Sequence, residues 1–348
     1  MTVMTPARLL RAADTLVQGQ FAVAPGESVL ITADSATEHR LIDAIAAAVV
    51  RAGARPLVAL APQLPFQGGL SDPYVSDSLK AAAVASDVWF DLCFPYHAGS
   101  AATSAAIAGN RCRYLLLATA GADSFERLYG CVDFAALMDF NLAFAAFVAD
   151  AAGGPMRVAC PLGTDLSCIL DRPKLVRERV ARTPGLHTVP GTQSFYPVQD
   201  SVRGRVVLQA LFDEDHRILR RPITIAVDGR IRAVEGGAAE DRPSLERSLR
   251  RASGGRGDFG QCIHFTFGFH PAARLTGRHF IEDIRVPGSN AVGMGLPWWE
   301  PGGGENHPDG IGLDQSLWIG DRPVAEAGRL TGPPDLLRLY EAMARRLD

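Results

Sequence analysis

Residues 28–61 read SVLITADSATEHRLIDAIAAAVVRAGARPLVALA, in which a helical segment separates two short apolar segments. Ser28–Asp34 predicts a buried strand and Glu38–Arg51 a helix, while Gly53 stands where a glycine commonly ends a helix. The same order recurs downstream, with helices predicted over Asp77–Ala85 and Ala101–Gly109 and strands in VWFDLCF (88–94) and RYLLLATA (113–120). Strands that alternate with helices indicate a parallel sheet with helices on its faces.

The pattern changes after a long helix predicted over Phe134–Gly154. Short strands are predicted over Arg157–Cys160 and Asp165–Leu170, and a hairpin turns at Asp228-Gly229. Two further helices are predicted, over Glu240–Ala252 and Leu336–Leu347. We therefore predict an α/β domain with a largely parallel sheet over residues 1–154, followed by an α+β domain with mostly antiparallel strands over residues 155–348.

The composition is that of an ordinary globular protein, with 348 residues, 47% hydrophobic, 21% charged and a formal net charge of -3. This balance gives no electrostatic reason to expect a nucleic-acid partner. The apolar run Leu41–Val50 is too short to cross a membrane and is interrupted by Asp43, and the N-terminus lacks the features of a signal peptide. The six cysteines form no CxxC pair. We expect a cytoplasmic metabolic protein that binds neither nucleic acid nor membranes.

The loop GGGENHPDGIG, Gly302–Gly312, carries a histidine and an aspartate two positions apart. Pro308 favours an extended conformation for the residue before it, and in extended chain residues i and i+2 project to the same side. We therefore expect His307 and Asp309 to point the same way, although Pro-Asp-Gly is also ordinary turn chemistry.

A further histidine, His264, lies in QCIHFTFGFHP (261–271), which alternates like a strand. Ile263, Phe265, Phe267 and Phe269 share one face, so His264 shares the opposite face with Cys262, Thr266, Gly268 and His270. His264 is either a core histidine satisfied by hydrogen bonds or a ligand that joins His307 and Asp309. The remaining histidines in charged surroundings, His39, His216 and His279, are predicted to lie at the surface.

Two histidines and one carboxylate are a metal-ligand set with more than one use. The set suits non-haem Fe(II) oxygenases, and it also binds catalytic zinc. The chemistry would be oxygen activation in the first case and hydrolysis by activated water in the second.

The C-terminal half resembles the thermophilic (M29) aminopeptidase family and, more closely, the 2,5-dihydroxypyridine 5,6-dioxygenases. The aminopeptidases carry E-x-x-x-G-x-N-P, which here reads His264-Phe-Thr-Phe-Gly268-Phe-His270-Pro271. Their G-T-x-H-x-x-x-G reads Gly288-Ser-Asn-Ala291-Val-Gly-Met-Gly295, and their G-E-x-x-x-x-P has Thr192 in place of glutamate. Of the peptidase metal ligands only the pair His307-x-Asp309 is kept. A second metal therefore has no obvious place, and the resemblance implies one Fe(II) held by His264, His307 and Asp309.

The resemblance also implies residues that contact the substrate. Tyr96 and His97 follow a strand at its carboxyl end, where ligands of open α/β sheets gather. His97 is expected to face the second domain and to act as acid and base for a ring hydroxyl, although a loop-capping role is equally compatible. Ser289 is expected to line the pocket. Phe195 stands where the dioxygenases are expected to carry a histidine, so the ring substrate is expected to differ. Trp298 and Trp299 either wall the same pocket or are plain packing.

The leading hypothesis is an Fe(II)-dependent, extradiol-type dioxygenase that opens a hydroxylated aromatic or heteroaromatic ring with O₂. A metallo-aminopeptidase or related hydrolase is the alternative enzyme, and a catalytically silent binding subunit is the alternative from another class. The partners expected are a small ring substrate, O₂ and further copies of the chain in a homo-oligomer.

Overall fold

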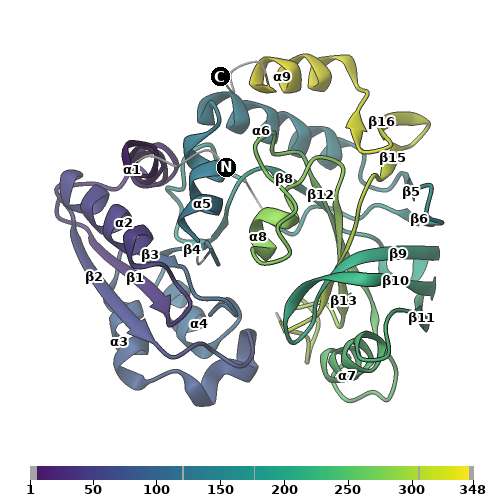
Figure 1. Ribbon diagram of the computed structural model, residues 1–348, viewed down its shortest axis with the longest axis horizontal. Coiled ribbons are helices and arrows are strands. Elements are labelled where there is room, and N and C mark those ends of the chain that lie inside the picture. The colour runs from purple at the N-terminus through teal and green to yellow at the C-terminus, as the bar shows by residue number, and fades with distance from the viewer. Residues whose placement is uncertain (1–5, 120, 176, 305, 345–348) are drawn as a thin grey trace. The chain divides into compact units, whose positions relative to one another are not determined.

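The computed structural model describes residues 6–119, 121–175, 177–304 and 306–344 (Figure 1). The described chain divides into two compact units. Unit 1 comprises residues 6–135 together with 177–190, and unit 2 comprises residues 136–175 together with 191–344. The segment 177–190 thus returns to unit 1 after the chain has entered unit 2.

Unit 1 is built on a five-stranded sheet in the order β2-β1-β3-β4-β7, in which all pairs are parallel. The prediction of a parallel sheet is confirmed. The strands are β1 (Ser28–Asp34), β2 (Arg55–Ala61), β3 (Val88–Asp91), β4 (Arg113–Leu116) and β7 (Gly185–Thr188). The helices are α1 (Pro6–Asp14), η1 (Thr15–Gln20), α2 (His39–Arg51), η2 (Gly68–Tyr74), α3 (Asp77–Ala85), α4 (Ala101–Ala108), α5 (Ala122–Phe125) and η3 (Glu126–Gly130).

Local chemistry sets the ends of these elements. Helix α3 is capped by Ser76, whose hydroxyl accepts a hydrogen bond from the backbone N–H three residues later. The hydroxyl of Ser100 caps α4 in the same way. Gly53 follows α2 at a φ of +75°, which a residue with a side chain adopts only under strain. Strand β3 is buried along its whole length, and it ends at Asp91, opposite Thr32 of β1. The carboxyl ends of β1 and β3 therefore bring polar side chains together inside the unit.

Unit 2 contains a twelve-stranded sheet, whose main path runs β17-β16-β15-β5-β6-β9-β14-β13-β12-β8, with β10 pairing both β9 and β11. Its pairs are antiparallel, as predicted for the second half of the chain. The strands are β5 (Pro155–Ala159), β6 (Asp165–Ile169), β8 (Thr192–Phe195), β9 (Arg203–Phe212), β10 (His216–Asp228), β11 (Arg230–Gly236), β12 (Gln261–Gly268), β13 (Asn290–Gly295), β14 (Asp309–Gly312), β15 (Ser316–Ile319), β16 (Arg322–Glu326) and β17 (Arg329–Leu330). The helices are α6 (Phe134–Asp150), η4 (Gln199–Ser201), α7 (Asp241–Ala252), α8 (Phe280–Asp283) and α9 (Pro334–Ala344).

The core of unit 2 gathers on helix α6. The ring of Phe269, which follows β12, packs against two rings of α6. Its centroid lies 4.6 Å from that of Phe140 and 5.8 Å from that of Phe144. Phe195 of β8 contacts Phe144, and Tyr340 of α9 contacts Phe140. Truncating one such buried ring to alanine typically costs about 3–5 kcal/mol. The apolar face of β12 is therefore firmly held, which fixes the direction of its opposite face.

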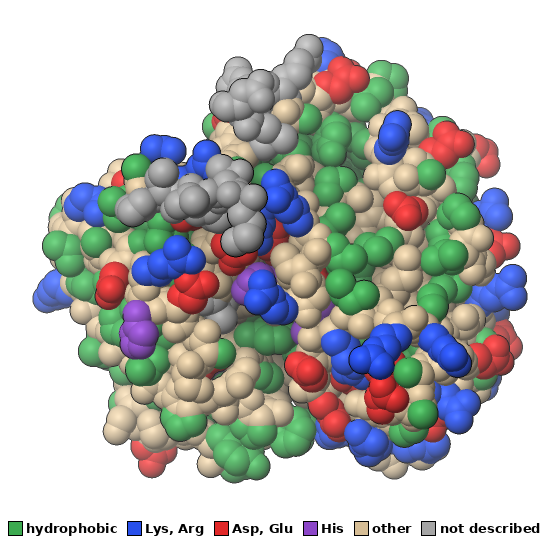
Figure 2. Space-filling model, viewed as in Figure 1, with side chains coloured by type: hydrophobic (Ala, Val, Ile, Leu, Met, Phe, Trp, Pro, Cys, Tyr) green, Lys and Arg blue, Asp and Glu red, His purple; other side chains and the backbone are tan. Residues whose placement is uncertain are grey.

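Arginine and acidic side chains gather over α7, β10 and β11, at the lower right of the surface in Figure 2. Arg217 binds both Asp213 and Asp241, and Glu214 accepts from Arg247 and Arg251. His216 was predicted to lie at the surface, and that prediction is wrong. It is 6% exposed and its Nε2 lies 2.8 Å from the buried carboxylate of Asp283.

Among the described residues no single helix is both long and apolar enough to cross a membrane. The two segments Ala122–Gly130 and Phe134–Asp150 meet the length and composition test only as a pair, bent by 77°.

Candidate metal centre and a buried acid–base pair

Three neighbouring strands of unit 2 bring His264 and Asp309 to the same row. In the register of the sheet His264 of β12 is opposite Gly293 of β13, and Gly293 is opposite Asp309 of β14. Cross-strand partners share a face of the sheet, so the imidazole and the carboxylate lie on one face with a glycine between them.

Gly293 is the reason the row has room for a ring. A Cβ built on Gly293 would lie 2.3 Å from Nε2 of His264 and less than 3 Å from two further ring atoms. Real Cβ atoms do not approach this closely, so any side chain at position 293 would displace the imidazole. The glycine is needed here for space, and its backbone lies outside the left-handed region that also favours glycine.

His307 completes a cluster in which three ligand atoms converge. Its Nε2 lies 3.2 Å from Nε2 of His264 and 3.7 Å from Oδ2 of Asp309, while His264 Nε2 lies 3.8 Å from Oδ1 of Asp309. The backbone N–H of Met294 in β13 donates to the carbonyl of Pro308, which ties the His-Pro-Asp segment to the sheet. His307 and Asp309 point the same way, as the extended chain at Pro308 leads one to expect.

Both imidazoles of the cluster are held neutral. Burial lowers the pKa of His264 well below its usual value, with a further contribution from His307, and burial lowers the pKa of His307 to about 4. Metal ligation requires neutral imidazole and ionised carboxylate. Two imidazole nitrogens 3.2 Å apart beside a carboxylate could hold a divalent cation. The three residues fit the metal that the sequence implies, although the donor set alone does not separate iron from zinc.

Polar groups that the sequence interpretation did not assign to the site orient both rings. Nδ1 of His264 lies 3.2 Å from the hydroxyl of Thr266, which lies 3.3 Å from the hydroxyl of Ser194 on β8. Nδ1 of His307 lies 3.5 Å from the carbonyl oxygen of Gly304. Thr266 could have been found from the strand alternation, because it is two residues after His264.

Two aromatic rings lie beside the imidazoles, and a third packs against both of them. Trp298 is stacked with His307 at 6.1 Å and meets His264 edge-on at 5.9 Å. Tyr196 lies 6.4 Å from His264 and also contacts both Trp298 and Trp299. The two tryptophans are half-buried, so they lie beside the cluster with part of each ring open to solvent.

Two predicted substrate-binding residues of unit 2 lie away from these rings. Phe195 of β8 is opposite Phe265 on β12, is 1% exposed and packs on Phe144, so it lies on the core face of the sheet, and His264 lies on the other face. Its neighbour Tyr196 supplies the ring beside His264. Ser289 is fully buried and donates to the carbonyl of Ile284. Their roles in substrate binding stay predictions.

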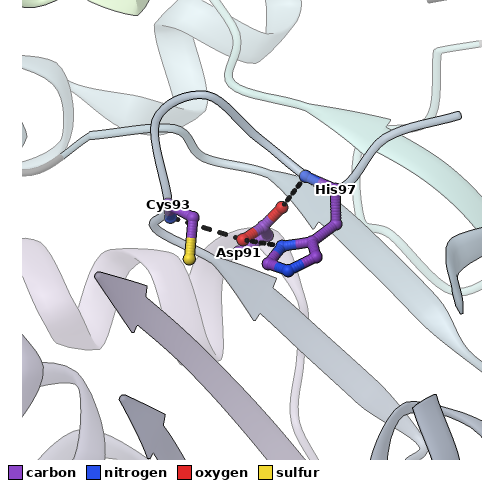
Figure 3. Close-up of side chains that lie close together, drawn as sticks. All are labelled: Asp91, Cys93 and His97. Atoms are coloured by element: carbon purple, nitrogen blue, oxygen red, sulfur yellow. Dashed lines mark hydrogen bonds and ion pairs between the residues drawn. The ribbon is translucent and has the colours of Figure 1, made fainter. Parts of the chain in front are cut away.

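His97 lies in unit 1, next to a buried carboxylate. Its Nδ1 is 3.0 Å from Oδ1 of Asp91, and its backbone N–H donates to Oδ2 at 2.8 Å. Both residues are almost fully buried. Figure 3 shows the imidazole turned with Nδ1 toward Asp91, so that Nε2 points away from it. Tyr96 is also buried, with its ring 6.5 Å from Phe94.

Asp91 is the centre of this second cluster. It accepts five hydrogen bonds: two from His97 and one each from Thr32, Tyr114 and the backbone of Cys93. Cys93 lies beside the pair, and burial raises the pKa of its thiol. Asp91, Cys93 and His97 are close enough to hold a cation. However, a cation here would have to break the bonds that already occupy both carboxylate oxygens, so an anchored imidazole is the better interpretation.

The charges of the pair stabilise each other. Burial opposes ionisation of both groups, but the charge and hydrogen bonds of Asp91 outweigh it and raise the pKa of His97. In the same way burial would raise the pKa of Asp91, and the charge and hydrogen bonds of His97, with a bond from Tyr114, hold it below its usual value. Asp34 is a further acidic group that favours the protonated form of His97.

The chain is similar to known proteins in both sequence and fold. The fold of the chain is shared with two solved structures, a 2,5-dihydroxypyridine dioxygenase and AmpT. The family model described as NicX, 2,5-dihydroxypyridine 5,6-dioxygenase, matches residues 15–291, and the chain belongs to that family.

Two solved structures are similar over nearly their whole length. The 2,5-dihydroxypyridine dioxygenase of Pseudomonas putida KT2440 has a TM-score of 0.70 and 17% identity, with 96% of this chain and 99% of that chain covered. Wild-type AmpT from Thermus thermophilus has a TM-score of 0.63 and 13% identity, with 94% and 99% covered. At these identities the likeness establishes the fold. No curated protein sequence matches the chain.

Gly293→Ala should weaken divalent-metal binding by about 10–100-fold, because a Cβ would occupy the space of the His264 ring. Anaerobic titration with Fe(II) measures the affinity, and the melting temperature of metal-free protein shows whether the fold persists. Gly69→Ala is the matched control, since a Cβ there meets nothing within 4 Å. Wild-type affinity in Gly293→Ala would show that the ring can move aside.

Asp91→Asn leaves the buried imidazole of His97 without its counter-charge, so it should lower the pKa of His97. For the same reason it should lower the free energy of unfolding by about 3 kcal/mol. The raised pKa of His97 contributes stability below pH 6.5 that is lost as pH rises through the folded value. The lowered pKa of Asp91 contributes stability above pH 3.8 that is lost as pH falls through the folded value. The loss of unfolding free energy relative to wild type should therefore be largest between pH 3.8 and pH 6.5. Denaturant unfolding at a series of pH values measures it.

Proposed function

We propose that this protein is a mononuclear non-haem Fe(II) dioxygenase of the extradiol type, acting with O₂ on a hydroxylated aromatic or heteroaromatic ring. The observation that carries the proposal is the convergence of His264, His307 and Asp309, two neutral imidazoles and one carboxylate within 4.8 Å of one another. Membership of a ring-cleaving dioxygenase family supports it.

The net charge of the three ligands is also compatible with oxygenase chemistry. One carboxylate leaves a divalent ion with a net charge of about +1 and open positions for further ligands, as in the oxygenases that use two histidines and one carboxylate. A ferrous ion held there would supply the one-electron chemistry through which O₂ reacts with an electron-rich ring. The rings of Trp298 and Tyr196, about 6 Å from the imidazoles, place apolar surface beside the cluster and limit the access of water.

His97 is the proposed acid and base for the substrate hydroxyl. Its Nδ1 is committed to Asp91, which leaves Nε2 as the nitrogen that holds or accepts a proton. Proton transfer by histidine near neutral pH requires a pKa in that range, and Asp91 raises the pKa of His97 from its usual value. Tyr96, Phe195 and Ser289 remain the proposed substrate-binding residues. A cytoplasmic location and a homo-oligomeric state are also part of the proposal.

The likeness to AmpT keeps a metal-dependent hydrolase as the alternative, but at 13% identity that likeness concerns the fold. The donor geometry does not favour hydrolysis over oxygen chemistry. Measurement of O₂ consumption and of peptide hydrolysis distinguishes the two functions.

Protein reconstituted anaerobically should bind one Fe(II) per chain and consume O₂ with one or more members of a panel of dihydroxylated benzenes and pyridines. His307→Ala should abolish iron binding, because it removes one of three ligands, whereas His39→Ala, which alters an exposed histidine, should not. Metal analysis and an oxygen electrode provide the measurements. Leucine-peptide hydrolysis that increases with Zn(II) and is indifferent to O₂ would instead establish the hydrolase.

His97→Gln should bind Fe(II) as wild type does and lower kcat by about 10²–10⁴, the usual contribution of a positioned proton-transfer group. Glutamine is chosen because it retains a hydrogen-bond donor toward Asp91 but cannot titrate. The pH dependence of kcat on the best ring in the panel should lose one ionisation. A variant with full activity and an unchanged pH profile would remove His97 from the mechanism.

A further inference from the structure

Strand β2 is an open edge of unit 1, and it exposes apolar side chains on both of its faces. It pairs with β1, and no second strand of the described chain pairs with it (Figure 1). Leu57, Val58 and Leu60 are 53%, 43% and 58% exposed. Strands of a parallel sheet are normally covered, and natural proteins protect an open edge with charged side chains. We therefore expect this apolar edge to be covered by another strand.

The free backbone groups of β2 lie between two prolines. The N–H of Arg55 donates to the carbonyl of the residue before β1, so the odd-numbered residues of β2 direct their backbone groups to β1. The even-numbered residues direct theirs outward. Pro56 and Pro62 have no N–H, which leaves Val58 and Leu60 as the two outward donors. Any strand that covers this edge must match those two donors and the carbonyl groups of the same residues.

We propose that β2 pairs antiparallel with β2 of a second copy of the chain, with Ala59 on the two-fold axis. Val58 of one copy then lies opposite Leu60 of the other, and each residue exchanges two hydrogen bonds with its partner. All four outward donors of the two copies are used, and the donor-less Pro56 and Pro62 face each other. The inference rests on the homo-oligomeric state included in the proposed function, and it identifies the surface that forms the oligomer.

The side chains favour the same register. On one face of the pair, Val58 and Leu60 of both copies form a cluster of four apolar side chains. On the other face, the exposed Leu57 lies opposite Ala61 of the second copy. Apolar side chains that are half or more exposed in one copy therefore gain an apolar neighbour across the axis.

Charge favours a second copy as the occupant of this edge. Residues 56–71 include no charged residue, so the acidic or basic side chains of a different strand would find no opposite charge here. A copy of β2 is uncharged over the same length. Antiparallel pairing also separates the two Arg55 side chains, which parallel pairing would set side by side. The pairing is closed by the two-fold axis, so neither copy keeps β2 as an open edge.

Two substitutions should weaken the dimer without removing a bond to β1. Val58→Pro removes an outward donor, and Leu60→Lys places a charge in the apolar cluster. Each should raise the dissociation constant of the dimer by about 10–100-fold, as measured by sedimentation equilibrium. Ile218→Lys is the matched control for the second, because Ile218 of β10 is an apolar residue that is 47% exposed, and it should leave the constant unchanged. The melting temperature of each variant shows whether the fold persists.

The deciding measurement is a disulfide on the two-fold axis. The two Ala59 residues form a non-hydrogen-bonded pair with Cα atoms about 4.5 Å apart, a separation that a disulfide can span. Ala59→Cys should therefore give a disulfide-linked dimer on mild oxidation. Leu57→Cys is the matched control, because position 57 lies on the same face of β2 but opposite Ala61, and it should not link. Wild type controls for the native cysteines, which are free.

A monomeric wild type would overturn the pairing of β2, and so would an Ala59→Cys variant that links no more than wild type. Equal linking by Leu57→Cys, or an unchanged dissociation constant in Val58→Pro, would overturn it as well. Each variant should still bind Fe(II), since β2 carries none of the three ligands. Failure of the wild type to bind Fe(II) and to consume O₂ would refute the proposed dioxygenase, and the sedimentation and disulfide results do not depend on that outcome.

Discussion

The distance of 3.2 Å between two neutral imidazole nitrogens is the constraint on which the C-terminal unit depends. Neutral rings can be held this close only if a proton or a cation lies between them, and burial ensures that neither ring relieves the contact by taking up a second proton. The surroundings follow from this requirement. Gly293 provides the space, Asp309 provides the negative charge, and Thr266 and Gly304 orient the rings.

The sheet explains how residues separated by as many as 45 positions in the chain, 264 to 309, meet within a few ångströms. His264, Gly293 and Asp309 belong to adjacent strands and share one row of the register. The reverse face of β12 carries Phe265 and Phe267 into the core, where the chain continues to Phe269 against α6. Because a one-residue slip would exchange the two faces, burial of these rings also fixes the direction of His264. Core packing and site geometry are therefore the same constraint, applied to opposite faces of one strand.

Much of this could be predicted from local patterns. The bounds of β1 and α3 agree with the sequence, because burial and capping are local signals, and the alternation in β12 correctly separated His264 from the phenylalanines. Other features depend on pairings that no local pattern contains. The return of β7 to the first sheet is one, and the burial of His216 beside Asp283 is another. In the sequence Gly293 is an ordinary strand glycine, and only the register shows that it lies against an imidazole. In the same way, Asp91 is an ordinary strand end in the sequence, and only the structure shows the five hydrogen bonds that it accepts.

Charge bears on how many metal ions the cluster can accommodate. Two divalent ions about 3.5–4 Å apart require several carboxylates to offset their repulsion. The next row on the same face of the described sheet consists of Thr266, Ala291 and Ile311, which offer a hydroxyl, a methyl and a branched alkyl group. A second ion beside Asp309 would thus add two positive charges without adding a negative ligand in that row. The row therefore offers no carboxylate to a second ion, while its Thr266 hydroxyl lies beside Nδ1 of His264.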